Sequence, residues 1–224
     1  MNELNHIAFI MDGNGRWGLK KKNNRNYGHL AGVKTVKKIV ECSILFKVPI
    51  ISFYVFSTEN WKRPRPEVNY LFNLINIYFK KEINNIIKNK IKIIISGRLK
   101  KLPTKTRKIL KIVTDKTKKN QKLTVNLAIN YGSKNEIIDA VKKINHDSKT
   151  LTKEKIDKHL LSNLAFPDIL VRTGGQKRLS NFMLWQIAYA EIFFLDKLWP
   201  DFTKNDLKKI INKYHKIKRN FGGI

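Results

Sequence analysis

The chain of 224 residues carries 46 lysines and arginines against 17 acidic residues, a formal net charge of +29, and 42% of its residues are hydrophobic. This length suits one large domain, and the hydrophobic fraction excludes an intrinsically disordered chain. The single cysteine, Cys42, excludes an intrachain disulfide, and its apolar surroundings indicate a core residue rather than a nucleophile. No apolar run is long enough for a secretory leader or a membrane span. We therefore expect a single domain over residues 1–224, located in the cytoplasm.

The positive charge has three explanations: nucleic-acid binding, compositional drift in a chain rich in Lys, Asn and Ile, or attraction to anionic lipid or substrate. The lysines are scattered over the whole chain and do not form one stripe with interleaved aromatic residues, as a nucleic-acid site would. We favour drift, and no nucleic-acid partner is expected.

In chain order, apolar periodicity predicts strands and helices that alternate. The expected strands are His6–Met11, Ile50–Phe56, Ile91–Ile95, Leu123–Ile129, Ile169–Val171 and Ile192–Leu195. The expected helices are Leu30–Phe46, Val68–Lys88, Ile109–Lys119, Glu136–Ile144, Lys153–Ser162, Phe182–Tyr189 and Lys204–Arg219. This alternation predicts an α/β fold with a mainly parallel sheet flanked by helices.

Four polar clusters follow predicted strands: Asp12–Trp17, Ser57–Arg63, Asn130–Gly132 and Arg172–Ser180. In parallel sheets, ligands bind beyond the carboxyl ends of the strands. We therefore expect the four clusters to meet at one edge of the sheet and to form an active site.

The segment Gly13–Gly18 matches the dinucleotide fingerprint G-x-G-x-x-G after a strand. A nucleotide site also needs an acidic residue about 20 positions later, and the first one here is Glu41, inside a helix. The nucleotide reading therefore fails. A glycine turn can still bind a diphosphate through its backbone N–H groups, with Arg16 adding a guanidinium.

Asp12 precedes this anion-binding turn, where a bare carboxylate would repel a diphosphate. A bridging Mg²⁺ would resolve the conflict, because hard cations bind carboxylate and phosphate oxygens together. The alternative is that Asp12 caps a helix, and the residues alone do not decide between the two.

The other clusters have similar pairs of readings. Ser57–Pro64 is a capping box or polar turn, or a functional loop with hydroxyl, amide, indole and guanidinium groups. Arg172–Ser180 is a solvated basic loop, or a second diphosphate site with two arginines around a Gly-Gly turn. His29 alone carries little weight. Two anionic groups and a metal beside apolar helices suggest a prenyl transfer.

Together these clusters resemble the cis-prenyltransferase family of bacterial undecaprenyl diphosphate synthases over nearly the whole chain. The matching segments are HIAFIMDGNGRW (6–17), FSTENWKRP (56–64), NLAINYG (126–132), RTGG with RLSNF (172–182), WQIAYAE (185–191) and LWPDF (198–202). The chain departs from the family pattern at Gln176-Lys177, Gly97-Arg98 and Ser133.

The resemblance implies a role for each matched residue. Asp12 would ligate Mg²⁺ and assist diphosphate departure, Asn60 would help to remove a proton, and Glu191 would help to hold the metal, in this family from a partner subunit. The allylic diphosphate would be held by Gly13, Asn14, Gly15, Arg16, Arg25 and His29, with Trp17 nearby. Ser57, Thr58, Glu59, Trp61 and Arg63 would line the substrate site, and Arg172, Arg178, Leu179 and Ser180 would bind isopentenyl diphosphate.

The resemblance further implies a homodimer with a hydrophobic tunnel, and the Leu71–Ile87 face is either its wall or plain core. The expected activity is sequential cis condensation of isopentenyl diphosphate onto farnesyl diphosphate, with Mg²⁺. The product would be a long polyprenyl diphosphate, such as the undecaprenyl carrier of cell-wall synthesis, with peripheral membrane contact. The competing hypotheses are a nucleic-acid binder and a catalytically silent partner subunit.

Overall fold

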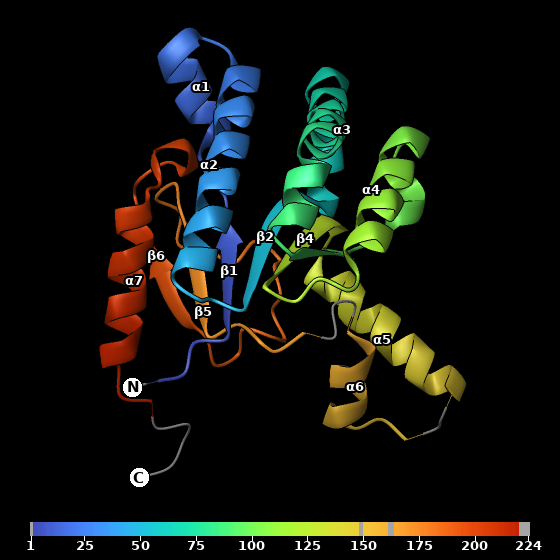
Figure 1. Cartoon of the computed structure of the whole chain (residues 1–224). Helices are drawn as coiled ribbons and strands as arrows, with labels where there is room; N and C mark the ends of the chain where they lie inside the picture. The colour runs from blue at the N-terminus through green and yellow to red at the C-terminus, as the bar shows by residue number, and fades with distance from the viewer. Residues whose placement is uncertain (1, 148–149, 161–163, 220–224) are drawn as a thin grey trace.

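Six strands lie side by side in one parallel sheet, in the order β3-β4-β2-β1-β5-β6 (Figure 1). The strands are β1 (His6–Ile10), β2 (Ile50–Ser57), β3 (Ile91–Ser96), β4 (Leu123–Tyr131), β5 (Ile169–Arg172) and β6 (Glu191–Phe194). This computed structural model describes residues 2–147, 150–160 and 164–219. The single-sheet α/β fold predicted from the sequence is confirmed.

The helices are α1 (Asn14–Lys22), α2 (Arg25–Leu45), α3 (Arg65–Lys88), α4 (Thr104–Thr117), α5 (Ser133–Asp147), α6 (Lys153–His159) and α7 (Lys204–Lys216). Short 3₁₀ helices follow β2 at Thr58–Lys62, β3 at Leu99–Lys101, and precede α7 at Trp199–Asp201. Within the described ranges, no helix is both long and apolar enough to cross a membrane.

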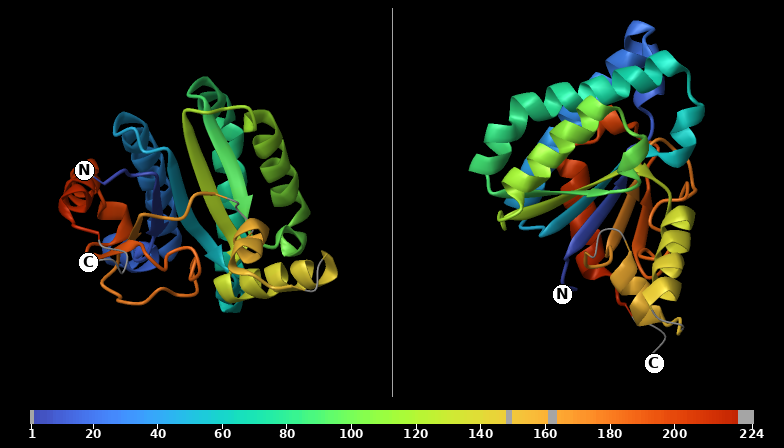
Figure 2. Two further views of the ribbon diagram at one scale, coloured as in Figure 1. Left: turned by 90° about the horizontal axis from the view of Figure 1, so that it is seen from below. Right: turned by 90° about the vertical axis from the view of Figure 1, so that its right-hand side faces the viewer.

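Alternate strand residues face two different layers, as the pleat requires. Ile7, Phe9 and Phe53 pack in the main core under α2, α3, α4 and α7. On the opposite face, Ala8 and Leu170 pack against the irregular segment 179–190, beyond which lie α5 and α6 (Figure 2). The sheet is thus buried on both sides, which explains why its strands read as continuous apolar runs.

A buried chain of polar side chains crosses the second face of the sheet. The His6 Nε2 atom lies 2.8 Å from Ser52 Oγ, Asn126 Nδ2 donates to the same oxygen at 3.0 Å, and Ser96 Oγ donates to Asn126 Oδ1 at 2.8 Å. These bonds join side chains from four adjacent strands. Ser52 and Asn126 are register partners, whereas His6 and Ser96 are each offset by two residues from the register partner of the residue they bond, and an offset of two keeps them on the same face.

Two expectations about helices are wrong. The segment Asp12–Trp17 is not only a turn: helix α1 begins at Asn14, and α2 begins at Arg25 rather than Leu30. Conversely, Phe182–Tyr189 forms a bend and successive turns instead of a helix; Met183 within it has a positive φ angle, as do Ser180 and Asn181 just before it. The apolar residues of this segment pack on the sheet, and their spacing resembles that of a helix. A series of turns can bury the same residues, so the spacing alone did not identify a helix.

The other helices occur where they were predicted, but their ends are shifted. The predicted ends of the strands lie within two residues of the observed ends. The structure describes α6 to His159, so the predicted end of that helix at Ser162 lies outside the described residues. Helix α3 begins three residues before the expected Val68, because Pro66 in its first turn needs no hydrogen-bond partner.

Candidate active site

Three of the four predicted polar clusters line one cavity at the carboxyl-terminal edge of the sheet, while the fourth, Asn130–Gly132, does not line it and contacts Trp61 and Thr58 instead. Asp12 follows β1, Ser57 ends β2, and Arg172 ends β5. All three line one cavity of about 480 Å³ between α2, α3 and the sheet. The structure therefore brings together segments that lie far apart in the sequence.

Asp12 is held between two arginines at the mouth of this cavity. Its Oδ1 atom accepts a hydrogen bond from Arg16 at 3.2 Å and its Oδ2 atom accepts one from Arg172 at 2.9 Å. Arg16 also donates to the Gly174 carbonyl at 2.8 Å. Gly13, with φ of 104°, precedes α1 and no side chain caps the helix, so the helix-cap reading of Asp12 is wrong. The carboxylate faces the site instead.

Arg172 is a buried cation, with only 3% of its side chain exposed. Its Nη1 donates to the backbone carbonyl of Arg178 and to Ser180 Oγ at 2.8 Å, while its Nε is buried without a partner. The Arg178 and Ser180 side chains are exposed. The Arg172–Ser180 segment is therefore anchored by one buried guanidinium and is more than a solvated basic loop.

A second cluster of cations surrounds one carboxylate, Glu67, at the start of α3. Arg25 donates to Glu67 through Nε at 3.0 Å and Nη2 at 3.2 Å, and both Arg63 Nη1 and His29 Nε2 lie 3.2 Å from Glu67 Oε1. The sequence motifs pointed to Arg25, His29 and Arg63 but not to Glu67. The available signal was its i+4 spacing from Arg63, which is common on helices and therefore weak.

Burial and charge act against each other in this cluster. Burial opposes the ionisation of Glu67, but the hydrogen bonds from Arg25 and His29 and the nearby guanidiniums outweigh it and lower its pKa. Burial lowers the pKa of His29, and the charges of Arg63 and Arg25 act in the same direction against the pull of Glu67. We expect a neutral imidazole facing an ionised carboxylate at pH 7.

The loop after β2 is both a capping box and part of the site. The backbone N–H of Ser57 donates to Asn60 Oδ1 at 3.1 Å, and the Ser57 side chain bonds in return to the Asn60 backbone. Both residues also line the cavity. The two readings of this segment are therefore compatible.

Thirteen of the predicted site residues line the cavity: Asp12, Gly13, Asn14, Gly15, Arg16, Arg25, His29, Ser57, Asn60, Arg63, Arg172, Arg178 and Ser180. Of the others, five make contacts outside the lining, and Glu191 lies apart. Trp61 donates to Asn130 Oδ1 at 2.7 Å, Trp17 stacks on Tyr27, and Glu59 accepts from Asn181 at 3.0 Å. Thr58 lies beside Gly132 and Asn181, and Leu179 packs in the second core cluster.

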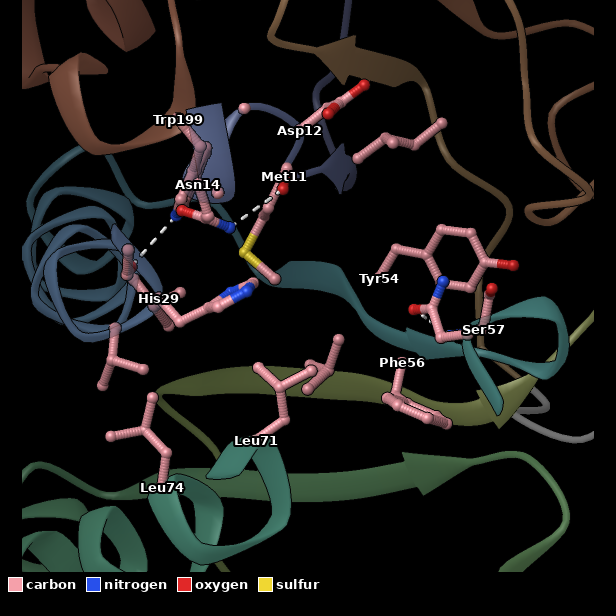
Figure 3. A pocket seen from close by; sticks show the side chains of 18 of the residues that line it. Met11, Asp12, Asn14, His29, Tyr54, Phe56, Ser57, Leu71, Leu74 and Trp199 are labelled. Carbon is pink, nitrogen blue, oxygen red and sulfur yellow. Dashed lines mark hydrogen bonds between the residues drawn. The ribbon is translucent and has the colours of Figure 1, made fainter. Parts of the chain in front are cut away.

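The cavity changes from polar to apolar with depth. Its far side is lined by Leu71, Leu74, Ile75, Tyr78 and Phe79 of α3 and by Val33 and Val36 of α2. Figure 3 shows Leu71 and Leu74 facing His29 and Met11 across this space. The first half of the predicted Leu71–Ile87 face is therefore a cavity wall, while Ile86 lies in the core.

The residues at the mouth fit a metal ion that is bound partly by the protein and partly by the substrate. Across the described parts of the chain, no three His, Cys, Asp or Glu side chains form a metal-binding group. Mg²⁺, however, is commonly bound by one or two carboxylates together with substrate phosphates, and Asp12 offers one partly exposed carboxylate beside the arginines.

One chain does not bring the two predicted metal ligands together. Glu191 pairs with Ile169 at the start of β6, whereas Arg172, the contact of Asp12, pairs with Phe194. At about 3.3 Å per residue, this separation is about 10 Å along the strand. A metal role for Glu191 at this site would therefore need a partner subunit.

A cavity with a cationic mouth, one partly exposed carboxylate and an apolar interior suits a substrate that joins a diphosphate to a hydrocarbon. This arrangement defines the class of protein as an enzyme of prenyl diphosphates.

Comparison with known proteins identifies the family. Residues 10–222 match the prenyltransferase family described as "Putative undecaprenyl diphosphate synthase". An isoprenyl transferase from Fusobacterium nucleatum is 46% identical over 98% of this chain and 96% of its own, and one from Treponema pallidum is 43% identical over 99% and 100%. The chain therefore belongs to the undecaprenyl diphosphate synthase family and is a cis-prenyltransferase.

Solved structures agree with this assignment. A probable undecaprenyl diphosphate synthase from Campylobacter jejuni superposes with a TM-score of 0.87 at 38% identity, covering 99% of this chain and all of the other. A lavandulyl diphosphate synthase from Lavandula x intermedia, in complex with dimethylallyl diphosphate, superposes with a TM-score of 0.92 at 26% identity, covering 97% and 98%. The family resemblance drawn from the sequence motifs is confirmed.

Proposed function

We propose that this protein condenses isopentenyl diphosphate sequentially, in cis geometry, onto an allylic diphosphate such as farnesyl diphosphate. The product would be a long polyprenyl diphosphate, undecaprenyl diphosphate, which carries cell-wall precursors. The observation that supports this most directly is one cavity with two cationic clusters at its mouth and an apolar interior.

The two clusters suit two diphosphates. Arg16 and Arg25, with the backbone of α1, would hold the allylic diphosphate so that its hydrocarbon enters the apolar part between α2 and α3. Arg172, Arg178 and Ser180 would hold isopentenyl diphosphate beside it. Binding both substrates side by side would hold the reacting carbon atoms of the two molecules close together. A reaction between two separate molecules would then take place within a single complex.

At the reacting centre, Asp12 would share Mg²⁺ with a diphosphate, and this ion supplies positive charge for the departing group. The guanidiniums of Arg16 and Arg172 supply further charge at the same point. Asn60, held by the Ser57 capping box, would assist loss of the proton from isopentenyl diphosphate as the new bond forms.

The experiment is an assay with radiolabelled isopentenyl diphosphate, Mg²⁺ and either farnesyl or dimethylallyl diphosphate as primer. Butanol-extractable products are resolved by chain length on reversed-phase plates. We expect long products with farnesyl diphosphate and none without a primer. Folded protein that yields only short condensation products, or none, would refute the proposal.

The remaining parts of the proposal concern the whole protein. A homodimer would supply Glu191 from the partner subunit, because one chain does not bring it to Asp12. A cytoplasmic protein that meets membranes peripherally would suit water-soluble substrates and a lipid product. Light scattering in solution and fractionation of cells measure these two properties.

A further inference from the structure

Helix α1 and the start of α2 form a corner that extends past the carboxyl-terminal edge of the sheet (Figures 1 and 2). Large apolar side chains are exposed on this corner: Leu19 by 43%, Tyr27 by 40% and Leu30 by 39%. Residues 19–25 are exposed without interruption. All three belong to the two helices of this one projection, which makes the corner a candidate contact surface.

The two segments that form this corner carry basic residues and no acidic ones, while Asp201 and Glu67 contact Trp17 and Arg25 from neighbouring elements. No acidic residue occurs between Asp12 and Glu41, whereas Lys20, Lys21 and Lys22 end α1 and Lys34 and Lys38 continue along the exposed side of α2. A surface that combines lysines with exposed leucine and tyrosine matches an anionic bilayer, whose headgroups attract the cations and whose acyl region accepts the apolar side chains.

The corner is rigid and adjoins the cavity. Gly28 of α2 packs so closely on α1 that a Cβ atom there would lie 1.8 Å from the Asn14 carbonyl oxygen. The Trp17 ring stacks on Tyr27 with centroids 5.6 Å apart, and Trp17 Nε1 donates to Asp201. Gly15, Arg16, Arg25 and His29 of the same two helices line the cavity. A bilayer that touched this corner would therefore lie next to the cavity mouth.

We propose that the α1–α2 corner, defined by Leu19–Lys22, Tyr27 and Leu30, docks the protein on an anionic lipid surface. The reason for docking rests on the proposed function, because a long polyprenyl product is too apolar to leave through water and needs a bilayer beside the mouth. Nucleic acid would explain the lysines but leaves the exposed leucines without a partner.

Helix α4 provides a matched surface elsewhere on the molecule. It carries Lys105, Lys108 and Lys111, all exposed, but among its residues, all of which the structure describes, Ile112 is the one large apolar side chain that is exposed. If charge alone drew the protein to membranes, α4 would bind as well as the corner. If docking needs apolar insertion, the corner would bind more strongly.

The experiment measures co-sedimentation of the full chain, without substrates, with vesicles of phosphatidylglycerol and phosphatidylcholine or of phosphatidylcholine alone. Leu19→Gln with Leu30→Gln preserves every charge, and we expect partitioning onto anionic vesicles to fall about tenfold or more. The control pair, Ile112→Gln in α4 with Ile138→Gln in α5, replaces residues exposed by 45% and 49% and should change partitioning less than about twofold. Equal loss in both pairs, or no loss in the first, would overturn the proposal.

A second comparison tests the charge. Reversing Lys20, Lys21 and Lys22 to Glu should abolish binding to anionic vesicles, while reversing Lys105, Lys108 and Lys111 should reduce it only in part. Equal effects would mean attraction to net charge, and would contradict docking at the corner. Lys20–Lys22 variants that lose retention on RNA but keep vesicle binding would assign the corner to nucleic acid instead.

The outcome is separable from that of the proposed function. Circular dichroism establishes that each variant folds, and condensation is assayed in detergent, where no bilayer is needed. Vesicle binding that needs the corner in a protein without condensation activity would sustain docking and refute the proposed reaction. If the protein is active in detergent but its vesicle binding is unaffected by the corner substitutions, docking at the corner is refuted and the proposed reaction is supported.

Discussion

Glu67 is the single carboxylate that joins Arg25, His29 and Arg63. Glu67→Gln keeps the size of the side chain but removes the charge that holds two mutually repelling guanidiniums and the His29 imidazole together. We expect KM for the allylic diphosphate to rise about tenfold with a smaller fall in kcat, because each lost charge-assisted hydrogen bond costs about 1.5–3 kcal/mol and is partly replaced.

Glu82→Gln is the matched control. Glu82 lies on the same helix, is exposed to the same extent of 10%, and pairs with Lys37 away from the cationic cluster. Its replacement should leave KM unchanged. An unchanged KM in Glu67→Gln, measured by initial rates at saturating isopentenyl diphosphate, would contradict a positioning role for Glu67.

Asp12 is the residue whose removal should affect the chemistry most. Asp12→Ala removes the carboxylate between Arg16 and Arg172 and the only acidic group that lines the cavity among the described residues. We expect turnover to fall at least about 100-fold, the scale of losing one electrostatic group at a reacting centre. Single-turnover assays over a range of Mg²⁺ measure this. A variant whose remaining activity depends on Mg²⁺ concentration as the wild type does would argue against metal binding through Asp12.

His6 makes the stability of the fold depend on pH. Burial lowers its pKa from 6.5 to about 4, against the weaker pull of the Ala165 carbonyl and Asp168. Below pH 6.5 the His6 imidazole is protonated in the unfolded chain but stays neutral in the folded chain. The free energy of unfolding is therefore highest above pH 6.5 and falls as the pH drops toward 4. We expect a loss of about 2 kcal/mol between pH 7.5 and 5, measured by urea unfolding. His6→Asn should remove most of this slope, even if it lowers stability at both pH values.

At the scale of elements, the contact between α1 and α2 positions the diphosphate site. Replacing a helix glycine by alanine normally stabilises a helix by about 1 kcal/mol. Gly28→Ala should instead destabilise by about 3 kcal/mol, because the added Cβ would lie 1.8 Å from the Asn14 carbonyl oxygen, which is backbone and cannot rotate away. Thermal unfolding tests this, with the exposed Lys38→Ala on the same helix expected to change stability by less than about 0.5 kcal/mol. A stabilised Gly28→Ala would show that the two helices are not in backbone contact.

At the scale of the whole molecule, the net charge of +29 is spread over several surfaces. Exposed lysines occur on α1, on α4 and on α7, and these helices lie on different sides of the molecule in Figure 1. Such a distribution predicts weak retention on nucleic acid that is lost between about 50 and 200 mM salt, because many distant contacts rather than one footprint supply it. Filter binding of RNA across this salt range measures it. Retention of RNA that persists at about 200 mM salt would support the nucleic-acid hypothesis instead.

Local sequence patterns were sufficient for the strands and for most of the site. The apolar runs of β1, β2 and β4 are buried on both faces, so their composition alone marks them as central strands. Asp12, Arg16 and Arg172 follow strand ends, and the rule that parallel strands end at one edge placed them together. Helix α1 was missed because its nine residues include two glycines and carry a weak apolar pattern.

The sequence by itself determined the family, the parallel sheet and the edge at which the polar clusters meet, because these depend on local periodicity and short motifs. Tertiary structure alone decided that Glu67 bonds to Arg25 and His29, since these contacts join α2 to α3. It also decided that segment 182–189 covers the sheet as turns and that Glu191 lies away from Asp12 in one chain. Such contacts depend on how distant segments pack, and no local pattern of residues records that.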